Sequence, residues 1–115
     1  GLDEITITSE TTIAELKDHK IKEYKISPKQ FGISLASFEK IYANSPQQSL
    51  MMVKEAFEGE KSAVQDMIAM NSGAALYISR IVESINDGVE LAFELMNNGM
   101  ASNKLAEYVR ASNNI

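Results

Sequence analysis

The sequence predicts an α+β fold, in which a small β-sheet or hairpin at the N-terminus precedes about four α-helices. Between Ile5 and Ile26, apolar and polar residues alternate with the period of half-buried strands. From Ser45 onward, apolar residues recur at helical spacing, and serine caps and glycine stops divide the pattern. We therefore expect a single domain, and an unpaired sheet edge and a family resemblance, both given below, predict that this domain is partial. Its expected parts are strands in 1–26, connecting turns in 27–44 and helices in 45–115.

Three strands are expected in the N-terminal part. Ile5 to Thr8 alternates isoleucine with threonine, as a half-buried strand does. Residues 12–16 and 21–26 flank the polar run from Lys17 to Lys20, which predicts a hairpin with a four-residue loop. Three strands form a poor sheet without a covering layer, and the first strand would present an unpaired edge. That edge is one indication that neighbouring strands lie outside this sequence.

Four helices are expected in the C-terminal part. Three of them begin at serine caps, Ser45, Ser62 and Ser84, and the first ends near Gly59. The fourth should run from about Ala101 to Ala111. The second should be long and central, with a buried stripe formed by Val64, Ile68, Asn71, Ala75, Ile78 and Val82. The side chains that the fourth helix should bury are Leu105, Tyr108 and Val109.

The composition excludes several classes of function. A net charge of -5 argues against a nucleic acid or an anionic membrane as partner, because both need a basic patch. The absence of cysteine excludes disulfides and thiolate metal sites. No apolar run approaches the roughly 20 residues that cross a bilayer, and no signal-peptide pattern is present. We therefore expect a cytoplasmic protein.

An ordered series of motifs resembles anthranilate phosphoribosyltransferase and spans essentially the whole sequence. No single motif in the series is specific, but their order is. The motifs are Gly1-Leu2-Asp3-Glu4, Ala14-Glu15-Leu16-Lys17, Pro28-Lys29-Gln30-Phe31-Gly32, Gly59-Glu60-Lys61, Asn71-Ser72-Gly73-Ala74-Ala75-Leu76-Tyr77, Asp87-Gly88-Val89-Glu90-Leu91-Ala92 and Ser102-Asn103-Lys104-Leu105.

The resemblance implies an enzyme of tryptophan biosynthesis, which transfers a phosphoribosyl group from phosphoribosyl diphosphate to the amine of anthranilate. It further implies that this sequence is the C-terminal portion of the α/β domain of a nucleoside-phosphorylase/phosphoribosyltransferase-like fold. The sequence opens on an acidic pair without an initiator methionine, which also suggests part of a longer chain. The family's diphosphate loop, anthranilate contacts and dimer helices lie outside it. We therefore expect the isolated sequence to be inactive, and the full-length enzyme to be a homodimer.

Asp3 and Glu4 are the candidate metal ligands. In the family that the sequence resembles, the matching pair binds two magnesium ions beside the diphosphate of the substrate. Magnesium prefers oxygen ligands and is often held by one or two carboxylates together with substrate phosphates. The alternative is that both acids are merely solvated. Without the phosphates, two carboxylates make a weak Mg²⁺ site.

Asn71 is polar among apolar positions of the second helix. A buried amide without hydrogen bonds costs about 1–3 kcal/mol, so we expect it to bind the backbone of a neighbouring loop. On this interpretation, Asn71→Leu destabilises the fold but leaves magnesium affinity unchanged. The small run from Ser72 to Ala75 would let another element approach closely. His19 is expected to be exposed in the hairpin loop, and Gly59-Glu60-Lys61 to be a helix stop and charged linker rather than a phosphate nest.

Two alternative functions stay open. One is a free-standing α+β interaction module whose apolar surface binds a partner. The other is a portion of a paralogue with the same fold and another acceptor. An exposed or unnaturally paired sheet edge at residues 5–8 would favour a portion of a larger enzyme, whereas an edge covered by the chain itself would favour the module.

Overall fold

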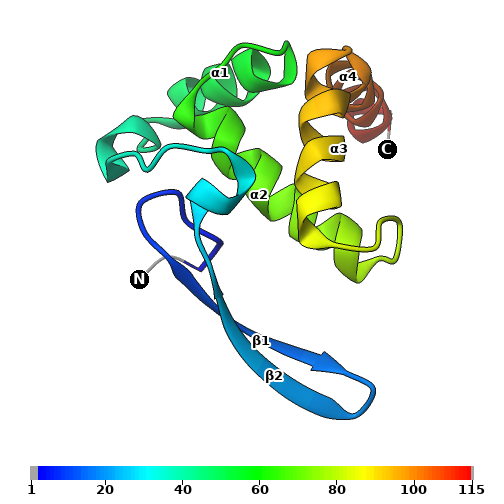
Figure 1. Cartoon of the computed structure of the whole chain (residues 1–115). Helices are drawn as coiled ribbons and strands as arrows, with labels where there is room; N and C mark the ends of the chain where they lie inside the picture. Colours follow the sequence, from blue (N-terminus) through cyan, green and yellow to red (C-terminus); the bar gives the residue numbers. More distant parts are fainter. Residues whose placement is uncertain (1–2, 115) are drawn as a thin grey trace.

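The computed structural model describes residues 3–114, so Gly1 and Leu2 of the first motif, and Ile115, lie outside the described residues. A two-stranded hairpin projects to one side of a group of four helices (Figure 1). This arrangement confirms the predicted α+β fold. The elements are β1 (Thr11–Lys17), β2 (Lys20–Ile26), the 3₁₀ turns η1 (Pro28–Phe31) and η2 (Phe38–Lys40), and the helices α1 (Pro46–Phe57), α2 (Ala63–Ile78), α3 (Ile85–Asn97) and α4 (Met100–Asn113).

The hairpin is present, but its loop is shorter than predicted. The strands pair antiparallel from Thr11 opposite Ile26 to Lys17 opposite Lys20. Only Asp18 and His19 remain in the loop, with φ angles of 53° and 65°. Two central residues with positive φ are what a type I′ turn requires, and this turn matches the twist of the strands better than a longer polar loop. The expected four-residue loop is therefore wrong, whereas His19 is exposed as expected.

The predicted strand at Ile5 to Thr8 is also wrong. This segment forms bends and irregular structure, and the only sheet within residues 3–114 has two strands. Ile7 is completely buried, and its carbonyl accepts a hydrogen bond from the backbone N–H of Ala36 at 3.1 Å. The alternation thus reflects a buried side chain in an irregular segment rather than a sheet ladder. Because residues 5–8 form no strand, they present no sheet edge whose exposure could distinguish a portion of an enzyme from a free-standing module.

Helix capping follows the sequence closely. The side chains of Ser45, Ser62 and Ser84 each accept a hydrogen bond at 3.0 Å from the backbone N–H three residues later. Each bond satisfies one of the unpaired donors of a helix N-terminus. The three predicted helix starts are therefore confirmed. Gly59 has a φ of +86°, which confirms the expected stop after α1.

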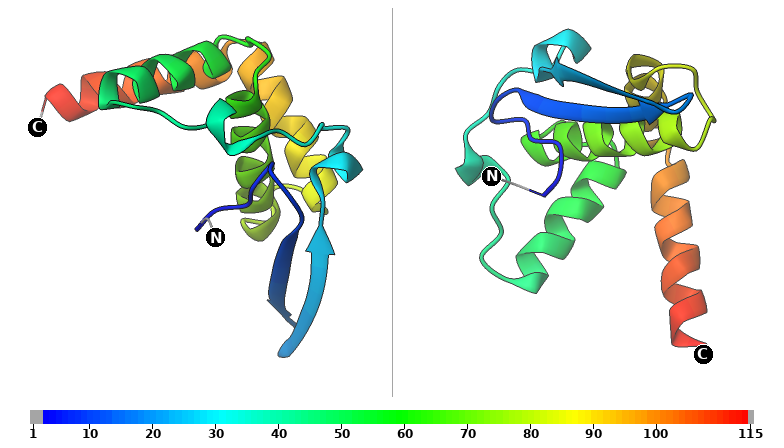
Figure 2. Two further views of the ribbon diagram at one scale, coloured as in Figure 1. Left: turned by 90° about the vertical axis from the view of Figure 1, so that its left-hand side faces the viewer. Right: turned by 90° about the horizontal axis from the view of Figure 1, so that it is seen from below.

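Helix α2 is central, as predicted, and packs mainly on α3 (Figures 1 and 2). Its buried residues are Gln65, Ala69, Met70 and Gly73. The first three residues of the predicted stripe are only half-buried. Its C-terminal end is wrong, because Ala75 is exposed, the helix ends at Ile78 and the Ile78 side chain is 77% exposed. The closest contact falls on Gly73, beside Gly88 of α3, as the small run from Ser72 to Ala75 predicts. The buried face of α2 is therefore set by the close approach of the two helices at Gly73, and not by the stripe of apolar residues in its sequence.

Helix α4 projects away from α2 and α3, on the same side of that pair as α1 (Figure 2). Its start is tied to α1, because the Ser102 hydroxyl donates a hydrogen bond to the Phe57 carbonyl at 3.0 Å. The predicted burial is wrong, because Leu105 is only half-buried and Tyr108 and Val109 are exposed. No other element in residues 3–114 covers these two side chains. Within residues 3–114, no helix has the length and apolar character needed to cross a membrane.

Candidate functional site

Asp3 and Glu4 lie at a bend immediately before Ile5, and both side chains are exposed. No group of three potential acidic, histidine or cysteine metal ligands occurs in the described part of the chain. The donor set is therefore two carboxylates alone. Such a set fits a hard cation that keeps several waters and takes further oxygens from a phosphate ligand, and it does not fit a closed site built from protein atoms only.

The bend is anchored to α2 by Asn71. The Asn71 Oδ1 accepts a hydrogen bond from the Ile5 N–H at 2.9 Å, and its Nδ2 donates one to the Ile5 carbonyl at 2.8 Å. The Nδ2 also donates to the Met67 carbonyl at 3.0 Å, one helical turn earlier. This confirms the prediction that Asn71 pairs with the backbone of a neighbouring segment. A primary amide presents the same donor and acceptor as a peptide group. Asn71 therefore satisfies both backbone groups of Ile5, as a neighbouring strand would in a sheet.

Threonine side chains hold the residues that follow. The Thr6 N–H donates to the Thr11 hydroxyl at 3.3 Å, which joins the segment to the start of β1. The Thr8 N–H donates to the Thr6 hydroxyl at 3.0 Å, and the hydroxyls of Thr6 and Thr8 lie 2.8 Å apart. Residues 5–8 are therefore an ordered connection between the acidic pair and the hairpin.

A second link joins the hairpin to the C-terminal end of α2. The Glu15 carboxylate accepts hydrogen bonds from the Tyr77 hydroxyl at 2.6 Å and the Tyr24 hydroxyl at 2.8 Å. These bonds, that of Tyr77 first, lower the pKa of Glu15. Burial and the bond to Glu15 raise the pKa of Tyr24 to about 12, and the bond to Glu15 raises the pKa of Tyr77. This cluster could not be predicted from the sequence, because no local pattern relates Glu15 to a tyrosine 62 residues away.

We expect Tyr77→Phe to lower the free energy of unfolding near pH 7 and to have much less effect near pH 3. The pKa of Glu15 is lower in the folded chain than its ordinary value of about 4.3. Its contribution to stability is therefore present above that ordinary pKa and is lost as the pH falls through the folded pKa. Urea unfolding of both proteins at the two pH values measures the effect. Tyr108→Phe, at an exposed tyrosine, is the control, and an equal effect of Tyr77→Phe at both pH values would contradict the expectation.

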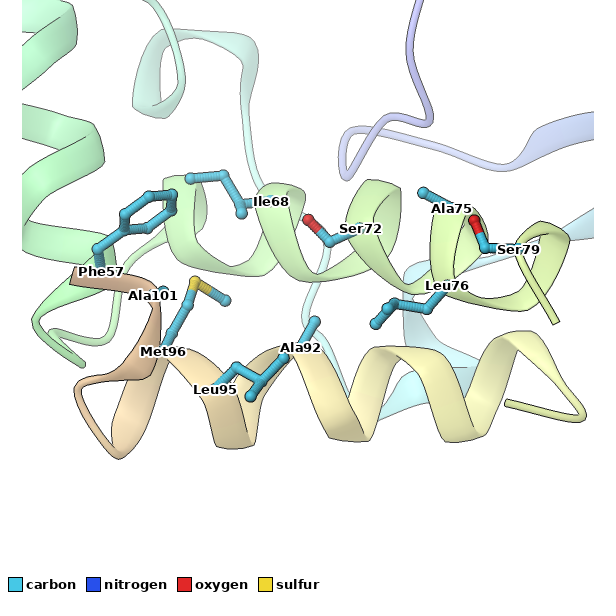
Figure 3. A pocket seen from close by; sticks show the side chains of 10 residues that line it. All are labelled: Phe57, Ile68, Ser72, Ala75, Leu76, Ser79, Ala92, Leu95, Met96 and Ala101. Carbon is cyan, nitrogen blue, oxygen red and sulfur yellow. The ribbon is translucent and has the colours of Figure 1, made fainter. Parts of the chain in front are cut away.

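The two principal cavities do not contain the acidic pair. One, of about 310 Å³, lies between α2 and α3 and is closed at one end by Phe57 and Ala101 (Figure 3). Its only polar side chains are Ser72 and Ser79, so it offers no acid, base or cation for catalysis. The other, of about 590 Å³, is lined in part by Lys61 and Asp66. Burial raises the pKa of Asp66, and the charge of Lys61 opposes that effect.

Comparison with known proteins identifies the class to which this fold belongs. Residues 1–102 match the model of the glycosyl transferase family a/b domain, and the chain belongs to that family. It is 41% identical over 112 residues to the anthranilate phosphoribosyltransferase of Vesicomyosocius okutanii, which covers 97% of this chain and 33% of the relative.

Solved structures agree with this assignment. The crystal structure of anthranilate phosphoribosyltransferase from Thermus thermophilus matches with a TM-score of 0.86 and 27% identity, over 96% of this chain and 32% of that one. The same enzyme from Saccharomyces cerevisiae, in complex with PRPP and Mg, has the same fold, with a TM-score of 0.86 at 21% identity over 100% of this chain and 33% of that one. The chain thus spans about a third of the length of its relatives. It corresponds to their C-terminal portion, as the sequence resemblance implies.

Proposed function

We propose that this chain is the C-terminal portion of an anthranilate phosphoribosyltransferase of tryptophan biosynthesis. The observation that carries the proposal is the 41% identity to such an enzyme across 97% of the chain. In the intact enzyme, the amine of anthranilate forms a bond to C1 of the ribose, the bond from C1 to the diphosphate oxygen breaks, and the amine loses a proton. Because the chain spans about a third of such an enzyme, the 115 residues alone are inactive.

The proposed metal ligands are Asp3 and Glu4, which bind Mg²⁺ together with the diphosphate of the substrate. Their exposed carboxylates and the anchored bend behind them support this role. When bound, Mg²⁺ supplies charge neutralisation for the leaving diphosphate. The two carboxylates would hold the ion beside the diphosphate and leave coordination positions for phosphate oxygens and water.

We propose further that the intact enzyme is cytoplasmic, acts on small molecules and forms a homodimer through residues outside this chain. The net charge of -5 supports a function without nucleic acid. The 115 residues form one partial domain, in which residues 1–26 belong to the strand-bearing part, 27–44 connect, and 45–115 are the closing helices.

A chimeric enzyme tests the proposal. This chain replaces the matching third of the Vesicomyosocius okutanii enzyme, and product formation is followed with phosphoribosyl diphosphate, anthranilate and Mg²⁺. We expect turnover by the chimera and none by the 115-residue chain. Circular dichroism and sedimentation establish that the chimera folds and assembles like the parent enzyme. A chimera that folds and assembles normally but is inactive with anthranilate contradicts the proposal.

A further inference from the structure

We propose that Asn71 is a positioning residue for the Asp3-Glu4 metal site, an inference that rests on the proposed metal role of this pair. Asn71 lies 66 residues from Ile5 in the sequence, yet it binds both backbone polar groups of the residue that follows Glu4. Asn71 thereby sets the direction in which the chain leaves Ile5 toward the two carboxylates.

The amide itself is held in one orientation. Its Nδ2 donates to the Met67 carbonyl as well as to the Ile5 carbonyl, which leaves Oδ1 to accept from the Ile5 N–H. A flipped amide would set its oxygen against two carbonyl oxygens and its nitrogen against an N–H. The three hydrogen bonds therefore specify a single orientation of the side chain.

The helix that carries Asn71 is a rigid base. Ala69, Met70 and Gly73 of α2 are buried beside it, and a Cβ on Gly73 would lie 2.5 Å from the backbone nitrogen of Val89. Two helices in backbone contact leave little freedom for either to move. Asn71 thus anchors the acidic bend to the pair of helices α2 and α3, whose backbones approach closely.

Other contacts hold the segment farther along the chain. Thr6 bonds to Thr11, and the Ile7 carbonyl bonds to Ala36. These bonds keep residues 6–8 in place when Asn71 is removed, whereas both hydrogen bonds of the Ile5 backbone are lost. The expected consequence is a local loss of order at Asp3 and Glu4. This revises the sequence-based expectation that magnesium affinity does not depend on Asn71.

The test uses the 115-residue chain with Mn²⁺ as a paramagnetic substitute for Mg²⁺ and inorganic diphosphate as the source of phosphate oxygens. Broadening of backbone amide NMR signals reports even weak binding and locates it. In the parent chain we expect the signals of Glu4 and Ile5 to broaden first. Replacing both acids, by Asp3→Asn with Glu4→Gln, should abolish this broadening.

The variant is Asn71→Ala, and the matched control is Tyr77→Phe, which removes a different long-range hydrogen bond of the same helix. We expect Asn71→Ala to weaken Mn²⁺ binding at the acidic pair by about 10-fold, and Tyr77→Phe to leave it unchanged. Urea unfolding measures the stability of both proteins. If Asn71→Ala does not give a folded spectrum, Asn71→Ser, whose side chain is too short to reach Ile5, takes its place.

The outcomes separate the two proposals. Parent-like Mn²⁺ affinity in a folded Asn71 variant overturns the positioning role and leaves the metal site intact. Equal weakening by the Asn71 variant and by Tyr77→Phe also overturns it, because a merely structural effect then accounts for both. If the parent chain with diphosphate shows no broadening at Glu4 and Ile5, the metal site itself fails, and the positioning role fails with it.

Discussion

Gly88→Ala is expected to lower the free energy of unfolding by about 3 kcal/mol or more, at the upper end of the range for overpacked cores. A Cβ on Gly88 would lie 2.2 Å from the carbonyl oxygen of Gly73 and 2.8 Å from its carbonyl carbon. These are backbone atoms, so no side-chain rotation relieves the clash. The helices α2 and α3 would have to separate, which would expose the core around Met70 and Val89.

Intrinsic helix propensity predicts the opposite sign, since alanine is favoured over glycine inside a helix by about 1 kcal/mol. The experiment therefore decides between packing and propensity. Urea unfolding followed by circular dichroism measures the variant, and Ala75→Gly, at an exposed position of α2, calibrates propensity with an expected loss of about 1 kcal/mol. A Gly88→Ala protein as stable as the parent would show that the helices do not approach this closely.

The parts of the fold that the sequence predicts are those set by local interactions. A serine cap binds an N–H three residues later, so Ser45, Ser62 and Ser84 identify their helices without tertiary information. Apart from the length of the hairpin loop, the main failures occur where partners are distant. The alternation at residues 5–8 resembles a strand, but Asn71 and Ala36 bind its backbone from distant elements, and nearby threonine hydroxyls bind further N–H groups of the segment.

In the candidate site too, some features are predictable from the sequence and others are not. Asp3 and Glu4 were selected by family resemblance, and the structure adds that both are exposed at an anchored bend. The role of Asn71 as a backbone partner was predicted from the cost of burying an amide, although its partner, Ile5, was not. Glu15, Tyr24 and Tyr77 were missed as a cluster, because one bond joins a strand to a distant helix. A single sequence contains no signal for such a pair.

The largest effect on activity is expected at the acidic pair. In the chimeric enzyme, Asp3→Asn or Glu4→Gln should lower the rate of phosphoribosyl transfer by about 100-fold at a fixed Mg²⁺ concentration, comparable to the loss of one group that stabilises transition-state charge. Both substitutions preserve size and remove one negative charge. They should also raise the Mg²⁺ concentration needed for half-maximal rate, because a neutral amide is a weaker ligand for a hard cation than a carboxylate.

Glu10→Gln provides the matched control, because it neutralises another exposed acid just before β1 without touching the bend. Rates are measured over a range of Mg²⁺ concentrations with saturating phosphoribosyl diphosphate and anthranilate. We expect Glu10→Gln to retain the rate and the Mg²⁺ dependence of the unsubstituted chimera. A general effect of net charge would shift all three variants together, whereas a metal-binding role confines the loss to Asp3 and Glu4. Unaltered kinetics in both of the latter would remove the acidic pair from the mechanism and leave it as a solvated turn.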